Sequence, residues 1–353
     1  MTARRAGPIA AVVAAVLASC SAASPSPSVA PTASPAASEA QASGTPTAAV
    51  PDCANDFSAS DGRVAFTIGL FGGPQGVATI NADGSGFQRI LDAVDIPGQP
   101  HGGTDTPRWT PDGRILVSSN RAGGPDDWRI FIMNADGGDL LQVTGGEDGI
   151  EWDGVMSPDG TTIVYAKALP TPDGPAPFGG GGIYASDADG TNERLLAPVP
   201  PGTSPEFPEG AEDEFPDVSP DGLRVVFNRS HTDEGGLFVV NIDGTGLTRL
   251  IDIAMDPERP RWTPDGQWIV FHTNSGEYET ESANLWVIRP DGTGLRQVTH
   301  ESLPGQAWAA DWSLDGEHIV LVESHLDIIG LDGSPTCTLF HGAGWNPDWG
   351  PAS

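Results

Sequence analysis

Basic residues are scarce in this chain. Its 353 residues include 17 lysines and arginines against 48 aspartates and glutamates, so the formal net charge is −31. A chain of this charge repels phosphate backbones, and we therefore expect no nucleic acid among its partners. Cations, basic proteins and neutral ligands remain compatible with it. The acidity also serves to keep an exported protein soluble.

Common catalytic motifs are absent. The sequence contains no G-x-S-x-G, no H-E-x-x-H and no G-x-x-x-x-G-K-[ST]. The seven histidines are scattered, with none at a helical metal-ligand spacing, and no Cys-x-x-Cys occurs among the three cysteines. We therefore assign no catalytic residue, no metal ligand and no cofactor, and we expect a protein that is not an enzyme.

Hydrophobic runs are short. The one near the start, PIAAVVAAVLA at 8–18, follows Arg4 and Arg5 and is too short to span a membrane as a mature helix. The end of this run overlaps Leu-Ala-Ser-Cys at 17–20, which resembles the bacterial lipobox. The resemblance implies that 1–19 is a lipoprotein signal peptide and that Cys20 carries lipid, which would hold the protein on the extracytoplasmic side of the cell membrane. An ordinary secretory signal is the alternative.

The residues that follow change composition abruptly. Residues 21–50 consist almost wholly of alanine, serine, proline and threonine, and nothing in them can form a core. We read 20–50 as a disordered tether and 51–353 as the folded domain.

The folded part is rich in glycine and proline, and these residues punctuate an internal repeat. The phrase PRWTPDG at 107–113 returns unchanged at 260–266. Variants of it alternate with a second phrase of the type NADG, and each occurs six times. Repetition at a period of about 40–50 residues indicates a repeat fold. The aspartate of the first phrase stands at Asp61, Asp112, Asp159, Asp221, Asp265 and Asp315.

Each repeat contains four short strands. In 260–299, PRWT is turned by PDG into the alternating β-branched stretch QWIVFHT, and NLWVIRP is turned by DGTG into LRQVT. Six such units predict an all-β fold: a six-bladed β-propeller with four-stranded antiparallel blades. In this interpretation PRWTPDG is structural rather than catalytic, because its tryptophan packs one blade against the next.

The repeat resembles the WD40-like PD40 unit of the TolB-like propellers, and the resemblance covers residues 54–351. In TolB a final Pro-x-Trp-Ser-Pro phrase supplies the inner strand of the first blade. NPDWGP at 346–351 matches that ending, which implies closure beside the strand RVAFTIG at 63–69. TolB also carries an α/β domain before its propeller, whereas only the tether stands there in this sequence. The resemblance therefore implies the fold rather than a role in the Tol system.

This closure would bring two cysteines to one seam. Cys53 precedes the first unit, and Cys337 lies in the last strand of the sixth. An exported protein is in an oxidising space, so we expect a Cys53–Cys337 disulfide, with two free thiols as the alternative.

The loops that precede each Pro-x-Trp phrase should gather on one face, around the mouth of the central channel. They are rich in carboxylates and also contain histidines and tryptophans, so they form our candidate binding face, although solvated loop residues would explain them equally. The face comprises His101, Asp105, Trp152, Asp153, Glu212, Asp213, Glu214, Glu258, His300 and Trp308.

These observations favour a lipid-anchored, monomeric binding or scaffold module that presents an acidic face to an envelope protein or peptide, including a cationic one. A carbohydrate or small-ligand binder is the first alternative, with Trp152 and Trp308 stacking on sugar rings. A metal-dependent propeller hydrolase or lyase is the second, and it would need histidines such as His101 and His300 to converge.

Overall fold

The protein was analysed as a computed structural model, and the part that it describes lies within Val50–Ser353. The predicted signal peptide, the predicted lipidation site Cys20 and the predicted tether lie outside the described residues. No helix in the described part is long and apolar enough to cross a membrane. The described residues are 53–69, 75–92, 103–121, 127–145, 149–170, 178–199, 212–230, 232, 234–273, 284–299, 309–322, 325–342 and 344–352.

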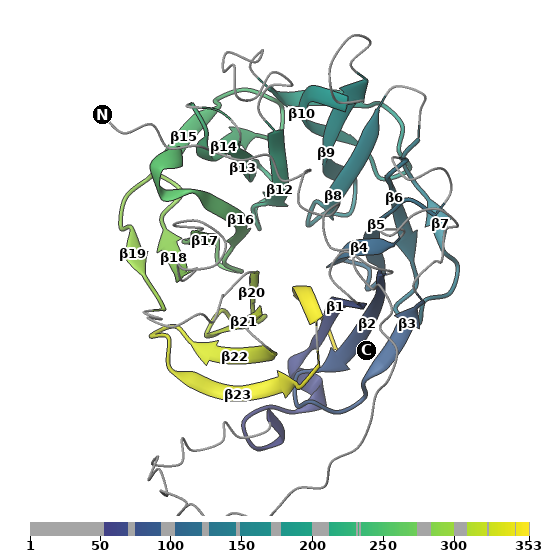
Figure 1. Cartoon of the computed structure of the whole chain (residues 1–353), viewed down its shortest axis with the longest axis vertical. Helices are drawn as coiled ribbons and strands as arrows, with labels where there is room; N and C mark the ends of the chain where they lie inside the picture. Colours follow the sequence, from purple (N-terminus) through teal and green to yellow (C-terminus); the bar gives the residue numbers. More distant parts are fainter. Residues whose placement is uncertain are drawn as a thin grey trace, which may run out of the picture. The chain divides into compact units, whose positions relative to one another are not determined.

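The domain is a ring of six four-stranded antiparallel sheets, which confirms the predicted six-bladed propeller (Figure 1). The first three blades, each from the inner strand outward, are β24 (Gly344–Gly350), β1 (Arg63–Gly69), β2 (Gln75–Asn81) and β3 (Gln88–Leu91); β4 (Thr104–Trp109), β5 (Ile115–Ser119), β6 (Arg129–Met133) and β7 (Leu141–Gln142); and β8 (Ile150–Met156), β9 (Thr162–Pro170), β10 (Phe178–Asp187) and β11 (Arg194–Pro198).

The other three blades follow the same order. They are β12 (Glu212–Val218), β13 (Arg224–Ser230), β14 (Gly236–Asn241) and β15 (Thr248–Asp252); β16 (Pro257–Trp262), β17 (Ile269–Thr273), β18 (Asn284–Ile288) and β19 (Arg296–Gln297); and β20 (Ala310–Trp312), β21 (His318–Val322), β22 (Leu326–Gly330) and β23 (Pro335–Phe340). Short 3₁₀ turns lie at Cys53–Asn55, Ala59–Asp61 and Ile253–Met255.

The repeated phrase forms the turn between the first and second strands of a blade. In the second blade, the Thr110 amide donates to the Arg114 carbonyl at 2.9 Å, and the Gly113 amide donates to the Thr110 carbonyl at 2.9 Å. Gly113 has a φ of 81°, a conformation that favours glycine. The Thr110 hydroxyl donates to the Asp112 carboxylate. Thr263 and Asp265 repeat that contact at 2.6 Å, so the phrase encodes a turn.

The core consists of six hydrophobic clusters among the described residues, each shared by two neighbouring blades. Trp262 of β16, for example, packs with Val226 and Leu237 of the preceding blade. A single blade cannot bury both of its faces, so stacking around the ring removes apolar surface from water.

The ring closes where the last strand of the domain lies beside its first. β24 pairs with β1 in antiparallel register, from Arg63 opposite Gly350 to Ile68 opposite Gly344, which confirms the expected closure. The disulfide between Cys53 and Cys337 is present at the same seam, between the first 3₁₀ turn and β23. Residues 284 apart in sequence are thereby linked.

Candidate functional site

The inner strands share a backbone irregularity that shapes the centre of the propeller. Five of them contain a register shift at a residue whose φ lies between 48° and 55°, the left-handed region. A proline follows in four cases and Gly154 in the fifth. Proline has no amide to donate to the sheet, so it favours a bulge at this point. The bulged residues are Thr106, Asp153, Phe215, Arg259 and Asn346.

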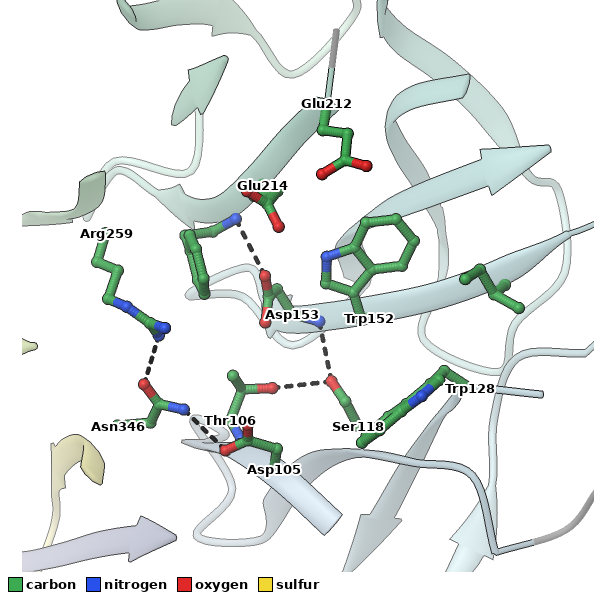
Figure 2. Close-up of a pocket in the computed structure, with 12 residues that line it drawn as sticks. Asp105, Thr106, Ser118, Trp128, Trp152, Asp153, Glu212, Glu214, Arg259 and Asn346 are labelled. Atoms are coloured by element: carbon green, nitrogen blue, oxygen red, sulfur yellow. Dashed lines mark hydrogen bonds between the residues drawn. The ribbon is translucent and has the colours of Figure 1, made fainter. Parts of the chain in front are cut away.

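All five bulged residues line one pocket at the centre of the ring, with a cavity volume of about 360 Å³ (Figure 2). Trp128 and Trp152 lie on one side of this mouth pocket, and Arg259 and Asn346 lie on the other (Figure 2). The lining residues are Asp105, Thr106, Ser118, Trp128, Ile150, Trp152, Asp153, Glu212, Glu214, Phe215, Arg259 and Asn346.

Asp153 is fixed from two neighbouring blades. Its backbone amide donates to Ser118 Oγ at 2.8 Å, and Ser118 in turn pairs with the Thr106 hydroxyl at 2.8 Å. Its carboxylate Oδ2 accepts from the amide of Phe215 at 3.2 Å. The three bulges thus hold one another, and the Asp153 side chain is 7% exposed.

The opposite wall holds a guanidinium group. Arg259 lies over the ring of Phe215, 4.0 Å from its centroid, and donates to Asn346 Oδ1. Asn346 Nδ2 donates to Asp105 Oδ1 at 2.7 Å, and that oxygen also accepts from the Thr67 hydroxyl at 2.7 Å. On this wall an aromatic face and an amide oxygen hold the guanidinium of Arg259.

Carboxylates crowd the pocket and perturb one another. Burial raises the pKa of Asp153 to about 6, with Asp105 adding to the rise and Arg259 opposing it. Desolvation raises the pKa of Glu214 well above its usual range, and the negative charges of Glu212, Asp153 and Glu258 add to that rise. Four carboxylates and a single guanidinium line the described walls, so the pocket favours positively charged ligands.

A buried ionic network lies farther along the inner strands, toward the Pro-Asp-Gly turns. Arg108 pairs with Asp217 and, at 2.6 Å, with Asp348. Both aspartates also accept backbone amides, Asp348 from Trp109 at 2.6 Å and Asp217 from Trp262 at 2.8 Å. Burial, together with the charge of Asp348, raises the pKa of Asp311 to about 7. This network ties inner strands together across the centre of the ring and is structural.

The structure brings five of the predicted face residues together. Asp105, Trp152, Asp153, Glu212 and Glu214 line the mouth pocket. They lie on inner strands rather than in loops, because the bulges extend each strand up to the mouth.

The other predicted residues are placed differently. Glu258 lies on β16, with Oε2 3.4 Å from His272 Nε2. Asp213 does not face the pocket: it is 3% exposed and forms a two-point ion pair with Arg229 at 2.6 and 2.7 Å. It alternates with its neighbours along β12, so its side chain points to the opposite side of the sheet. His101, His300 and Trp308 lie outside the described residues.

Sequence reasoning missed seven of the lining residues, namely Thr106, Ser118, Trp128, Ile150, Phe215, Arg259 and Asn346. The last three stand directly before a proline in the repeated phrase, a position that we interpreted as purely structural. Within the described part of the chain, no three His, Cys, Asp or Glu side chains are grouped so that they could hold a metal ion.

Two curated proteins illustrate what the sequence is similar to; no protein-family model matches it. The uncharacterized protein Atu1656 of Agrobacterium fabrum is 24% identical over 273 residues, covering 70% of this chain and 81% of that protein. Dipeptidyl-peptidase 5 of Porphyromonas endodontalis is 36% identical over 110 residues, but the match covers 29% of this chain and 15% of the peptidase.

Solved structures with a similar fold are also found. TolB from Acinetobacter baumannii superimposes with a TM-score of 0.60 at 18% identity, over 83% of this chain and 68% of that one. The fold is a TolB-like propeller. A putative TolB from Agrobacterium tumefaciens agrees, with a TM-score of 0.56 at 20% identity over 79% of this chain and 88% of its own. At these sequence identities the similarity to TolB shows the fold alone.

Proposed function

We propose that this TolB-like propeller is a lipid-anchored binding module of the cell envelope, which uses the mouth pocket to hold a protein or peptide. The observation that carries the proposal is the pocket itself. Five bulged inner strands direct side chains into one cavity, whereas the repeat alone would require only turns and packing. Its volume of about 360 Å³ suits a side chain or a short peptide segment.

Carbohydrate binding is the second candidate. Trp128 and Trp152 stand beside carboxylates in the pocket, an arrangement that also suits a sugar ring. The peptide reading is preferred because the remaining lining is strongly acidic, which a neutral sugar does not require.

Photo-crosslinking in cells tests the binding proposal. A photoreactive residue replaces the exposed Glu212 at the pocket, and in a second strain it replaces the exposed Leu223, which lies in the turn between β12 and β13. We expect a discrete protein adduct from position 212 and none from position 223. The same adducts from both positions, or none from position 212, would count against a protein-binding mouth.

Anchoring is tested separately. The intact chain should be recovered with membranes and extracted by detergent, whereas the Cys20→Ser variant should be exported without a lipid and appear in the soluble fraction. Metabolic labelling with a fatty-acid analogue reads out the modification directly. Equal partitioning of both forms would remove lipid anchoring from the proposal.

A further inference from the structure

The acidic wall of the mouth pocket contains a carboxylate with no described binding partner. The described residues give Glu214 neither a hydrogen-bond donor nor an ion pair, although it lies among negative charges. Arg259 opposes the rise in the pKa of Glu214 but forms no described ion pair with it, so a cation supplied by a ligand would further stabilise the ionised carboxylate.

A buried histidine lies beside Glu258, whose negative charge adds to that around Glu214. His272 is 1% exposed, and neither ring nitrogen has a hydrogen-bond partner. Its Nε2 faces the Glu258 carboxylate at 3.4 Å, next to Glu214. Burial lowers the pKa of His272, and the Glu258 carboxylate opposes that shift.

The aromatic side of the mouth pocket indicates which kind of cation it would bind. Trp128 and Trp152 present two indoles on the side of the pocket away from Arg259 (Figure 2). A planar guanidinium stacks on aromatic faces and offers five donors in a fork, whereas an ammonium is a compact, strongly hydrated point charge. The opposite wall already holds Arg259 against Phe215 in this manner.

We infer that the mouth pocket binds an arginine side chain of the protein partner, with the guanidinium between the two indoles and its donors directed at Asp153 and Glu214. This inference rests on the proposed function and names the chemistry of the partner. The partner therefore presents an arginine on an exposed loop or terminus that can enter the mouth.

The test is titration calorimetry of the detergent-solubilised full-length chain with capped five-residue peptides that differ only at the central position. The arginine peptide should bind, the lysine peptide should bind several-fold more weakly, and the uncharged citrulline peptide should not saturate at millimolar concentration. Glu214→Gln should weaken arginine binding by about tenfold or more. Glu317→Gln removes the same charge from an exposed turn and should leave binding unchanged.

Each remaining outcome overturns the inference. Absent arginine binding, equal binding of arginine and citrulline peptides, or equal effects of Glu214→Gln and Glu317→Gln would exclude guanidinium recognition. Agmatine binding as tightly as the peptide would indicate a small-molecule site instead. If position 212 still crosslinks a partner in the Glu214→Gln background, the proposed function stands and the arginine inference alone fails. Thermal unfolding of each variant confirms that the fold is intact.

Discussion

Asp153 combines three unusual properties at one position. It is nearly buried, it adopts a left-handed backbone conformation, and its pKa is raised to about 6. Each property costs stability, and residues that cost stability are concentrated at functional sites. By contrast, the buried Asp213 shares its charge with Arg229 and has a structural role.

The pH dependence of stability tests this reading. The pKa of an aspartate in the unfolded chain is about 3.9, whereas that of Asp153 in the folded chain is raised to about 6. The folded state therefore favours the protonated carboxyl. Its contribution to stability is fully present below about pH 4 and is lost as the pH rises through 6. Above pH 6 the ionised carboxylate, which faces Arg259, Arg261 and Asp105, costs roughly 3 kcal/mol. Asp153→Asn should therefore be more stable than the native chain at pH 8, and the gain should vanish at pH 4.

Chemical denaturation at both pH values measures the difference, with Asp56→Asn as the exposed control. A gain that is the same at pH 4 and pH 8 would show that ionisation of Asp153 is not its cause.

The strand and its turn are the level at which the sequence was most informative. Strand alternation and the Pro-Asp-Gly turns are local properties, so the six units could be predicted from them, whereas the closure was implied by the resemblance of the final phrase to the TolB ending. The bulges were not predicted, although a proline follows four of them; in the folded ring the neighbouring blade also holds Phe215, whose amide donates to the Asp153 carboxylate. Asp213 was misplaced because we assigned 212–214 to one loop, whereas along a strand alternate side chains point to opposite sides of the sheet.

Packing between blades predicts the effect of shortening one tryptophan. Trp262 is 5% exposed, its indole Nε1 donates to the Asp217 carbonyl at 3.2 Å, and the Arg224 guanidinium lies 4.8 Å from its ring centre. Trp262→Ala should lower the free energy of unfolding by about 3–5 kcal/mol, as large core truncations do. Leu223→Ala, at an exposed site in the adjoining blade, should change it by about 0.5 kcal/mol or less. Equal unfolding midpoints for the two variants would refute the packing assignment.

At the scale of the whole molecule, stability depends on joining the first and last blades. The β24–β1 pairing and the Cys53–Cys337 disulfide lie at the same seam, so a ring that opens there loses both. This closure was predicted because the truncated final phrase resembles the TolB ending, and the strand pairing confirms it. The ligand of the mouth pocket could not be predicted from the sequence, because the lining residues come from several blades and meet only in the folded ring.

Removing the disulfide tests the closure. The Cys53→Ser, Cys337→Ser double variant releases a link between residues 284 apart, worth roughly 5 kcal/mol in the chain-entropy model. We expect a lower guanidinium midpoint for the variant, matched by the native chain under reducing conditions. An unchanged midpoint in both would mean that strand pairing alone holds the seam.

The central claim is that the acidic mouth pocket is where the propeller meets its partner. It is tested most directly by in-cell photo-crosslinking from position 212 in three backgrounds: the otherwise native chain, Glu214→Gln and Glu317→Gln. The account predicts one discrete protein adduct in the native and Glu317→Gln backgrounds and its loss in Glu214→Gln. Absence of an adduct in all three backgrounds would contradict the claim.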